Sequence, residues 1–203
     1  MDSDTRRRVS VNLFNGYGFN GAGSWFRDHE AEVTYRPLSA FTITTGVRVN
    51  RAINAEQWIE KVTDTTDHYT FGQLSQTTVG LTERVNLTMT PNLSLQLYAQ
   101  PFVSAGDYGG FKELANGRSR DYAGRYVPFA YADHPDFNVK SFRTTNVLRW
   151  EYKPGSTLFV VWQQARENDA VPGGFRFGRD VHDIFGVAPR NVFLVKLAYW
   201  VNY

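Results

Sequence analysis

The chain has 203 residues, no cysteine, and a formal net charge of +2 from 22 basic and 20 acidic side chains. The lack of cysteine excludes a disulfide framework and a thiolate-ligated metal site, and the near balance of charge argues against nucleic-acid binding through bulk electrostatics. Mean hydropathy is −0.41 and no run of about 18 apolar residues occurs, so the sequence predicts no transmembrane helix.

Alternation of apolar and polar residues recurs along the chain, which is the pattern of strands with two different faces. The alternating segments are Val9–Leu13, Ala31–Tyr35, Phe41–Val49, Val79–Met89, Leu93–Ala99, Phe142–Tyr152 and Phe193–Tyr203. A further segment, Leu158–Gln164, is more continuously apolar, and its outward face stays ambiguous. Together they predict about eight strands.

The connections between these segments alternate between short and long. Three short turns, each with a proline, lie at Arg36–Ala40, Thr90–Leu93 and Lys153–Ser156. Four long loops are expected at Asn15–Ser24, Arg51–Tyr69, Ser104–Asp136 and Arg166–Arg190. This arrangement predicts an all-β fold, an antiparallel up-and-down transmembrane β-barrel over residues 1–203, with both termini on the short-turn side.

Charged residues fall on the face opposite the apolar one, and we expect them to point inward. They are Glu30, Glu32, Arg48, Arg84, Arg143, Arg149, Glu151 and Lys196. In a barrel of eight strands such side chains fill the interior as ion pairs or hold water, whereas in a wider barrel they line an aqueous lumen. Glu83 is the exception, because it falls on the apolar face; either a β-bulge shifts the register there or Glu83 lies near the membrane interface.

The C-terminal strand ends in an aromatic residue and resembles the recognition signal of bacterial outer-membrane β-barrels. The matching positions are Lys196, Ala198, Val201 and Tyr203, with alanine where the signal prefers glycine. The resemblance implies a bacterial outer-membrane location, with outer-membrane lipids and the barrel-assembly machinery as partners. The alternative is the last strand of an ordinary soluble sheet. Residues 1–8 lack the apolar core of a signal peptide, so we expect a mature form or the tail of a longer protein.

Candidates for catalysis or ligand binding are few. His29, His68, His134 and His182 lie in or beside the expected long loops, and carboxylates flank two of them in Asp133–Asp136 and Asp180–Asp183. No nucleophile motif accompanies them, so we expect solvated loops with no catalytic residue, no cofactor and no metal. The glycine- and arginine-containing segments Gly173–Arg179 and Gly117–Tyr122 are expected to be flexible loops, with binding of anionic groups as the alternative.

Five tryptophans favour an interfacial aromatic girdle, with sugar stacking as the alternative. They are Trp25, Trp58, Trp150, Trp162 and Trp200. Trp150 lies near a short turn, where a girdle on that side would fall, whereas Trp200 is expected to pack inside.

Three segments resemble one family of large bacterial outer-membrane proteins, in which a domain like a family 9 carbohydrate-binding module precedes a C-terminal DUF5916 barrel. The segments are Val147–Gln164, Phe193–Trp200, and Gly106–Tyr108 followed by Phe111–Leu114. The resemblance covers about the last two-thirds of the chain. It implies the C-terminal part of a longer protein, with further strands upstream and the carbohydrate-binding domain outside this chain.

The sequence therefore predicts a membrane anchor or part of a solute pore, without nucleic-acid partners. Two alternatives stay open. One is an outer-membrane barrel enzyme with a lipase- or protease-like site at the rim. The other is a soluble lipocalin-like barrel, which would need apolar residues pointing inward.

Overall fold

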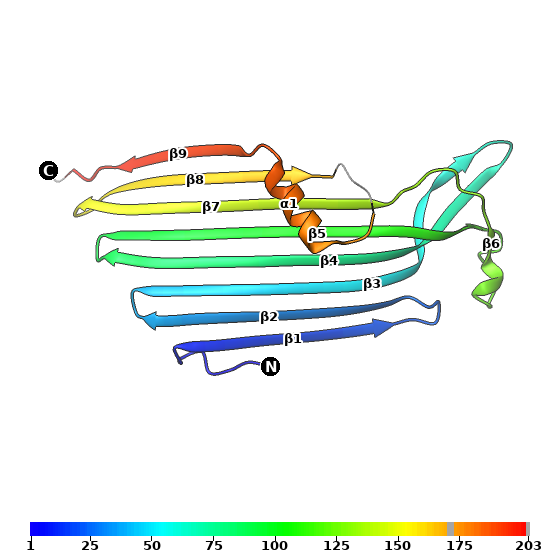
Figure 1. The fold of residues 1–203 in the computed structure, drawn as a ribbon, viewed down its shortest axis with the longest axis horizontal. Helices are drawn as coiled ribbons and strands as arrows, with labels where there is room; N and C mark the ends of the chain where they lie inside the picture. The colour runs from blue at the N-terminus through cyan, green and yellow to red at the C-terminus, as the bar shows by residue number, and fades with distance from the viewer. Residues whose placement is uncertain (170–172, 202–203) are drawn as a thin grey trace.

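The computed structural model describes residues 1–169 and 173–201, and its strands form one antiparallel sheet (Figure 1). The sheet follows chain order, β1-β2-β3-β4-β5-β7-β8-β9, with the short strand β6 beside β5. The strands are β1 (Val9–Phe19), β2 (Trp25–Leu38), β3 (Phe41–Thr63), β4 (Asp67–Thr90), β5 (Leu93–Leu114), β6 (Tyr126–Pro128), β7 (Phe137–Lys153), β8 (Ser156–Asn168) and β9 (Arg190–Ala198). The all-β, antiparallel prediction is confirmed.

The three predicted short turns are confirmed, and they lie together at one end of the sheet (Figure 1). Two residues join each pair of strands: β2 to β3, β4 to β5, and β7 to β8. The last turn is Pro154-Gly155, in which Gly155 has a φ of 75°, a conformation that favours glycine. We refer to this end as the short-turn end and to the opposite one as the long-loop end.

Two of the predicted long loops are too long, because half of the residues of Asn15–Ser24 and most of those of Arg51–Tyr69 are in strands. β1 continues to Phe19 before a five-residue connection, and β3 and β4 continue until only 64–66 separate them. Main-chain hydrogen bonds hold these extensions, with register shifts after Asn54 and Trp58. On β4 the buried positions of the extension include Thr70 and Gly72, so no apolar–polar alternation in the sequence could reveal it.

The other two predicted loops are partly structured. β5 continues to Leu114, followed by a 3-10 helix, Ala123–Arg125, and by β6, which pairs with β5. Between β8 and β9 the helix α1 (Phe177–Gly186) packs against β7 and β8. Ile184 is its buried anchor, and Phe185 contacts Phe142 of β7 with ring centroids 5.3 Å apart. Residues 170–172 of the predicted loop lie outside the described residues.

The sheet is open, so the predicted closure into a barrel is not observed within this chain. β1 and β9 occupy opposite edges, and they do not pair with each other in the described part of the chain. Residues 1–3 fold back onto the free edge of β1: the main-chain nitrogen of Leu13 donates to the carbonyl of Met1 at 2.9 Å, and that of Ser3 to Val11 at 2.9 Å. That edge therefore accepts antiparallel pairing.

The sheet buries few apolar side chains. In the described residues only Leu74, Val103, Ala105 and Ile184 are buried hydrophobic residues. Many large apolar side chains are exposed, among them Phe193 at 72% and Leu197 at 65%. No helix within the described residues is long and apolar enough to cross a membrane.

Replacing Gly155 with alanine should destabilise the β7–β8 turn by about 1–2 kcal/mol, because a Cβ is disfavoured at positive φ. The added Cβ would also lie 3.0 Å from Cβ of Trp200. The apparent unfolding midpoint in detergent measures the loss. Gly109→Ala is the control, since nothing lies within 4 Å of its added Cβ. Equal midpoints for the two variants would contradict the assignment of strain to this turn.

Candidate functional site

The register places the predicted charges on one face of the sheet. Glu32 of β2 lies opposite Gly46 of β3, and Arg48 of β3 lies between Glu30 of β2 and Gly80 of β4. Because side chains alternate along a strand and the central register has no slip, the charges of all these strands share the same side. We term this side the polar face; it carries Glu30, Glu32, Arg48, Arg84, Arg143, Arg149, Glu151 and Lys196.

Some of these charges are paired and others are not. Arg48 forms a bidentate interaction with Asp28, and Arg149 lies 3.2 Å from Glu151. Arg143 pairs with Glu167 at 3.0 Å. The sequence analysis missed both Asp28 and Glu167, although continuing the alternation backward from Glu30 would have placed Asp28 on the polar face.

Four charges of the polar face, Glu30, Glu32, Arg84 and Lys196, form no ion pair with any residue in the described ranges. The guanidinium of Arg84 lies 5.4 Å from the centre of the Tyr98 ring. Glu32 and Arg84 border a hollow of about 500 Å³ on this face, above Gly46 and Gly80. The polar face thus holds a water-accessible depression with unpaired charges at its margins.

The opposite side of the sheet, which we term the apolar face, carries the apolar members of each strand. Glu83 lies on it, between Thr45 and Ala99 in the register, and the pairing on both sides of Glu83 is unshifted. The β-bulge considered from sequence is therefore wrong. The hydroxyl of Thr45 donates to the Glu83 carboxylate at 2.7 Å, so this carboxylate has a partner within the apolar surroundings.

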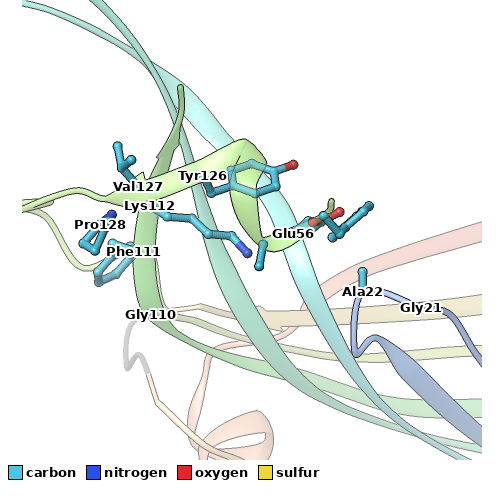
Figure 2. A pocket seen from close by; sticks show the side chains of 11 residues that line it. Gly21, Ala22, Glu56, Gly110, Phe111, Lys112, Tyr126, Val127 and Pro128 are labelled. Atoms are coloured by element: carbon cyan, nitrogen blue, oxygen red, sulfur yellow. The ribbon is translucent and has the colours of Figure 1, made fainter. Parts of the chain in front are cut away.

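A second depression, of about 520 Å³, lies at the long-loop end, where β3, β5, β6 and the β1–β2 connection meet. Figure 2 shows Lys112 and Tyr126 extending toward Glu56. The Lys112 ammonium donates to the carbonyl of Ala55 at 2.7 Å and lies 4.5 Å from the centre of the Tyr126 ring. Burial, with the Glu56 carboxylate nearby, raises the pKa of Tyr126. These contacts fasten β5 and β6 to β3, so we regard them as structural.

The four histidines lie on separate elements. Nδ1 of His29 donates to Oδ1 of Asn15 at 2.7 Å, whereas His134 lies in the irregular segment before β7. His182 is on α1 with its side chain 87% exposed. The described residues contain no group of three His, Asp or Glu side chains arranged to hold a metal ion.

His68 is the one of these histidines that forms a tight cluster. Its Nδ1 contacts Glu113 of β5, and its Nε2 lies 3.3 Å from Asp64 in the β3–β4 turn. The ring of Phe129 lies 5.1 Å away. The Glu113 carboxylate, opposed by partial burial and assisted by Asp64, raises the pKa of His68 above its usual value.

The segment Gly173–Arg179, expected to be a flexible loop, includes the start of α1, and the side-chain amide of Asn138 on β7 donates to the carbonyl of Gly173 at 3.2 Å. Arg179 donates to the carbonyl of Gly174 at 2.7 Å and pairs with Asp180 at 2.8 Å, so its guanidinium is engaged internally. Beneath α1, Lys140 is fully buried, 3.5 Å from Asp183. Sequence reasoning missed Lys140, because its position on β7 continues the apolar face. Gly117–Tyr122 is mostly exposed and precedes the 3-10 helix.

The C-terminal positions lie at the edge of the sheet. Lys196 and Ala198 are in β9, opposite Phe159 and Thr157 of β8. Val201 follows the strand, and Tyr203 lies outside the described residues. Trp200, expected to pack inside, is 61% exposed beside the β7–β8 turn, because β9 ends before it.

Comparison with known proteins identifies a family. A family model described as a domain of unknown function (DUF5916) matches residues 1–203. Neither a curated protein nor a solved structure matches the chain.

The His68 cluster predicts a pH dependence at the long-loop end. A raised folded-state pKa stabilises the fold fully below the unfolded value of about 6.5, and this contribution is lost as pH rises through the folded pKa. An NMR titration of the imidazole should therefore give a midpoint above that of unfolded histidine, and Glu113→Gln should lower it. A midpoint that Glu113→Gln leaves unchanged would contradict the assigned cause.

Proposed function

This chain belongs to the DUF5916 family along its whole length, and we propose that it is part of a bacterial outer-membrane β-barrel that acts as a membrane anchor or as part of a solute pore. The proposal rests on a sheet with one mostly apolar face, which suits contact with lipid, and one polar face with a hollow, which suits an aqueous lumen. On the apolar face, the consecutive apolar side chains of each strand form a band that runs across the sheet, which we term the apolar band. The observation that carries the proposal is the direction in which this band crosses the strands.

A single register row joins Val9 on β1 to Phe193 on β9 by way of Leu97 on β5. On β1 this row of paired residues marks the boundary of the apolar band nearest the short-turn end, because Val9 is the first residue of the strand. On β9 the same row marks the boundary of the apolar band nearest the long-loop end, because the next residue toward that end on the apolar face is the polar Asn191. The apolar band is therefore oblique to the register.

The slope of the apolar band gives the tilt of the strands relative to the band, which can be compared with the strand tilt of membrane barrels. Within β9 the band reaches Leu197, four residues past Phe193, over the seven strand-to-strand steps from β1 to β9, and the apolar alternation continues in the sequence to Val201, eight residues past Phe193. This is about half to one residue, or about 2–4 Å, for each strand spacing of about 4.8 Å, and it corresponds to a strand tilt of about 20–40°. Transmembrane barrel strands are tilted by about 35–45°. A flat apolar slab such as a bilayer gives this slope a direct physical reason.

The rival functions have less support. A lipocalin-like barrel encloses an apolar cavity, whereas the central hollow of this sheet is bordered by Glu30, Glu32, Arg48 and Arg84. A rim-site hydrolase needs a nucleophile, a base and an orienting group in contact. The histidines of this chain lie on separate elements, and the closest cluster, at His68, contains carboxylates and a threonine hydroxyl.

We propose that further strands of the same protein complete the barrel at the β1 edge. Support comes from residues 1–3, which already pair antiparallel with β1 and turn into it at the short-turn end, as the other short connections do. The chain folded alone in detergent should then lack the compact, fast-migrating band of a closed barrel on unboiled gels. A heat-modifiable compact band from this chain alone would show that β1 and β9 close on each other.

Lipid contact should alternate residue by residue. The chain has no native cysteine, so Leu95→Cys and Gln96→Cys on β5, and Val195→Cys and Lys196→Cys on β9, can each carry one fluorescent label. In bilayers, labels at Leu95 and Val195 should be quenched by lipid-borne nitroxides, and labels at Gln96 and Lys196 by water-soluble iodide. Iodide quenching of all four labels would contradict a transmembrane sheet.

The terminal strand should be read by the barrel-assembly machinery, as the resemblance at Lys196, Ala198, Val201 and Tyr203 implies. Deleting Tyr203 should reduce insertion into native outer membranes while leaving spontaneous insertion into pure lipid unchanged. Insertion into native membranes at the unmodified rate would overturn this partner assignment.

A further inference from the structure

Two glycines form the floor of the hollow on the polar face. Gly46 and Gly80 lie in the interior of β3 and β4, and neither has a positive φ. A Cβ on Gly46 would come no closer than 3.8 Å to Thr82, and one on Gly80 no closer than 3.9 Å to Phe102. Glycine weakens a strand, and neither backbone conformation nor crowding requires it at these positions. Because glycine has no side chain, these two positions leave the space that forms the hollow.

Opposite charges border this floor on two sides, offset by two residues along the strands, because Glu32 lies opposite Gly46 and Arg84 lies opposite Thr44. Glu32 projects from β2 and Arg84 from β4, on either side of the β3 strand that carries Gly46. The two strands are separated by two strand spacings, about 9.6 Å. Neither side chain has an ion-pair partner in the described part of the chain. Glu30, which also borders the hollow, has no ion pair there either, but it lies opposite Arg48 in the register and interacts with its charge. Arg48, which lies nearby, is engaged by Asp28.

The walls of the hollow supply hydrogen-bonding groups and one apolar surface. Thr82 and Gln100 lie on the β4 and β5 side, Asn50 is toward the long-loop end, and Phe102 flanks Gly80. A ligand that carries an ammonium at one end and a carboxylate at the other would satisfy the charges of Glu32 and Arg84 at once. A ligand with one charge would leave the opposite side chain without a partner.

We propose that the hollow is a binding subsite for zwitterionic solutes of the amino-acid or short-peptide class. The ammonium lies against Glu32, the carboxylate against Arg84, and the solute backbone over Gly46 and Gly80. The inference rests on the proposed function, since a polar face that lines a lumen is where a passing solute would meet this subsite. It adds to that function the chemical class of the solute.

Calorimetric titration of the full chain with glycylglycine tests the proposal. The protein is first inserted in lipid nanodiscs, and its insertion is verified with the label at Leu95. Saturable binding is expected, weaker by about tenfold in Glu32→Gln and in Arg84→Gln, the scale of one lost charged hydrogen bond. Gly46→Leu should abolish binding by filling the hollow, and Lys196→Gln, on the same face but distant, is the matched control.

The neutral probes N-acetylglycinamide and glucose complete the experiment. Binding of either one as tightly as glycylglycine would overturn the assignment to zwitterions and favour a subsite for neutral polar solutes. No saturable binding by the inserted protein, or equal affinities in wild type, Glu32→Gln and Arg84→Gln, would also overturn it. Failure of insertion, reported by the Leu95 label, is a separate result that counts against the membrane proposal. In that event, titration of the folded chain in detergent decides on the subsite.

Discussion

The structure depends on one constraint, the antiparallel register of eight strands, which is unshifted through the central part of the sheet. Side chains alternate between faces with a period of two, so a slip of one residue would transfer every apolar side chain of a strand to the polar face. The short turns maintain this register at one end, where two residues join each hairpin. The separation of Glu32, Arg48 and Arg84 from the apolar side chains, and the hollow among them, are consequences of that register.

The sheet has two zones along its strands. Near the short turns the alternation is strict, and apolar side chains remain exposed because few residues in the chain cover them. Toward the long-loop end β3, β4 and β5 extend past the apolar band. There the strict alternation of apolar and polar residues ends, and aromatic side chains such as Trp58 and Phe71 pack against each other. A transmembrane strand needs only about 9–11 residues, whereas β4 has 24. The excess length gives the extension that carries His68 and the Lys112–Tyr126 contact.

How much the sequence predicts differs between these zones. Alternation and proline-containing turns were sufficient to place the strands near the short turns and to assign Glu32, Arg84 and Lys196 to one face. The same logic failed for Arg51–Tyr69, because buried positions of this hairpin hold residues such as Thr70 and Gly72, which give no apolar periodicity. It also missed Lys140, whose burial depends on α1 packing over β7, and the hollow, which needs the register of Gly46 against Thr82. Such features come from contacts between distant segments, which periodicity along one strand does not encode.

The slope of the apolar band relative to the strands matches the orientation of tilted strands that cross the flat apolar layer of a bilayer. Polarised infrared spectroscopy of the chain in oriented bilayers measures the strand tilt directly through the dichroism of the amide I band. Our account predicts strands tilted by about 35–45° from the bilayer normal. Strands lying nearly in the bilayer plane, as for a sheet adsorbed through its apolar face, would contradict it.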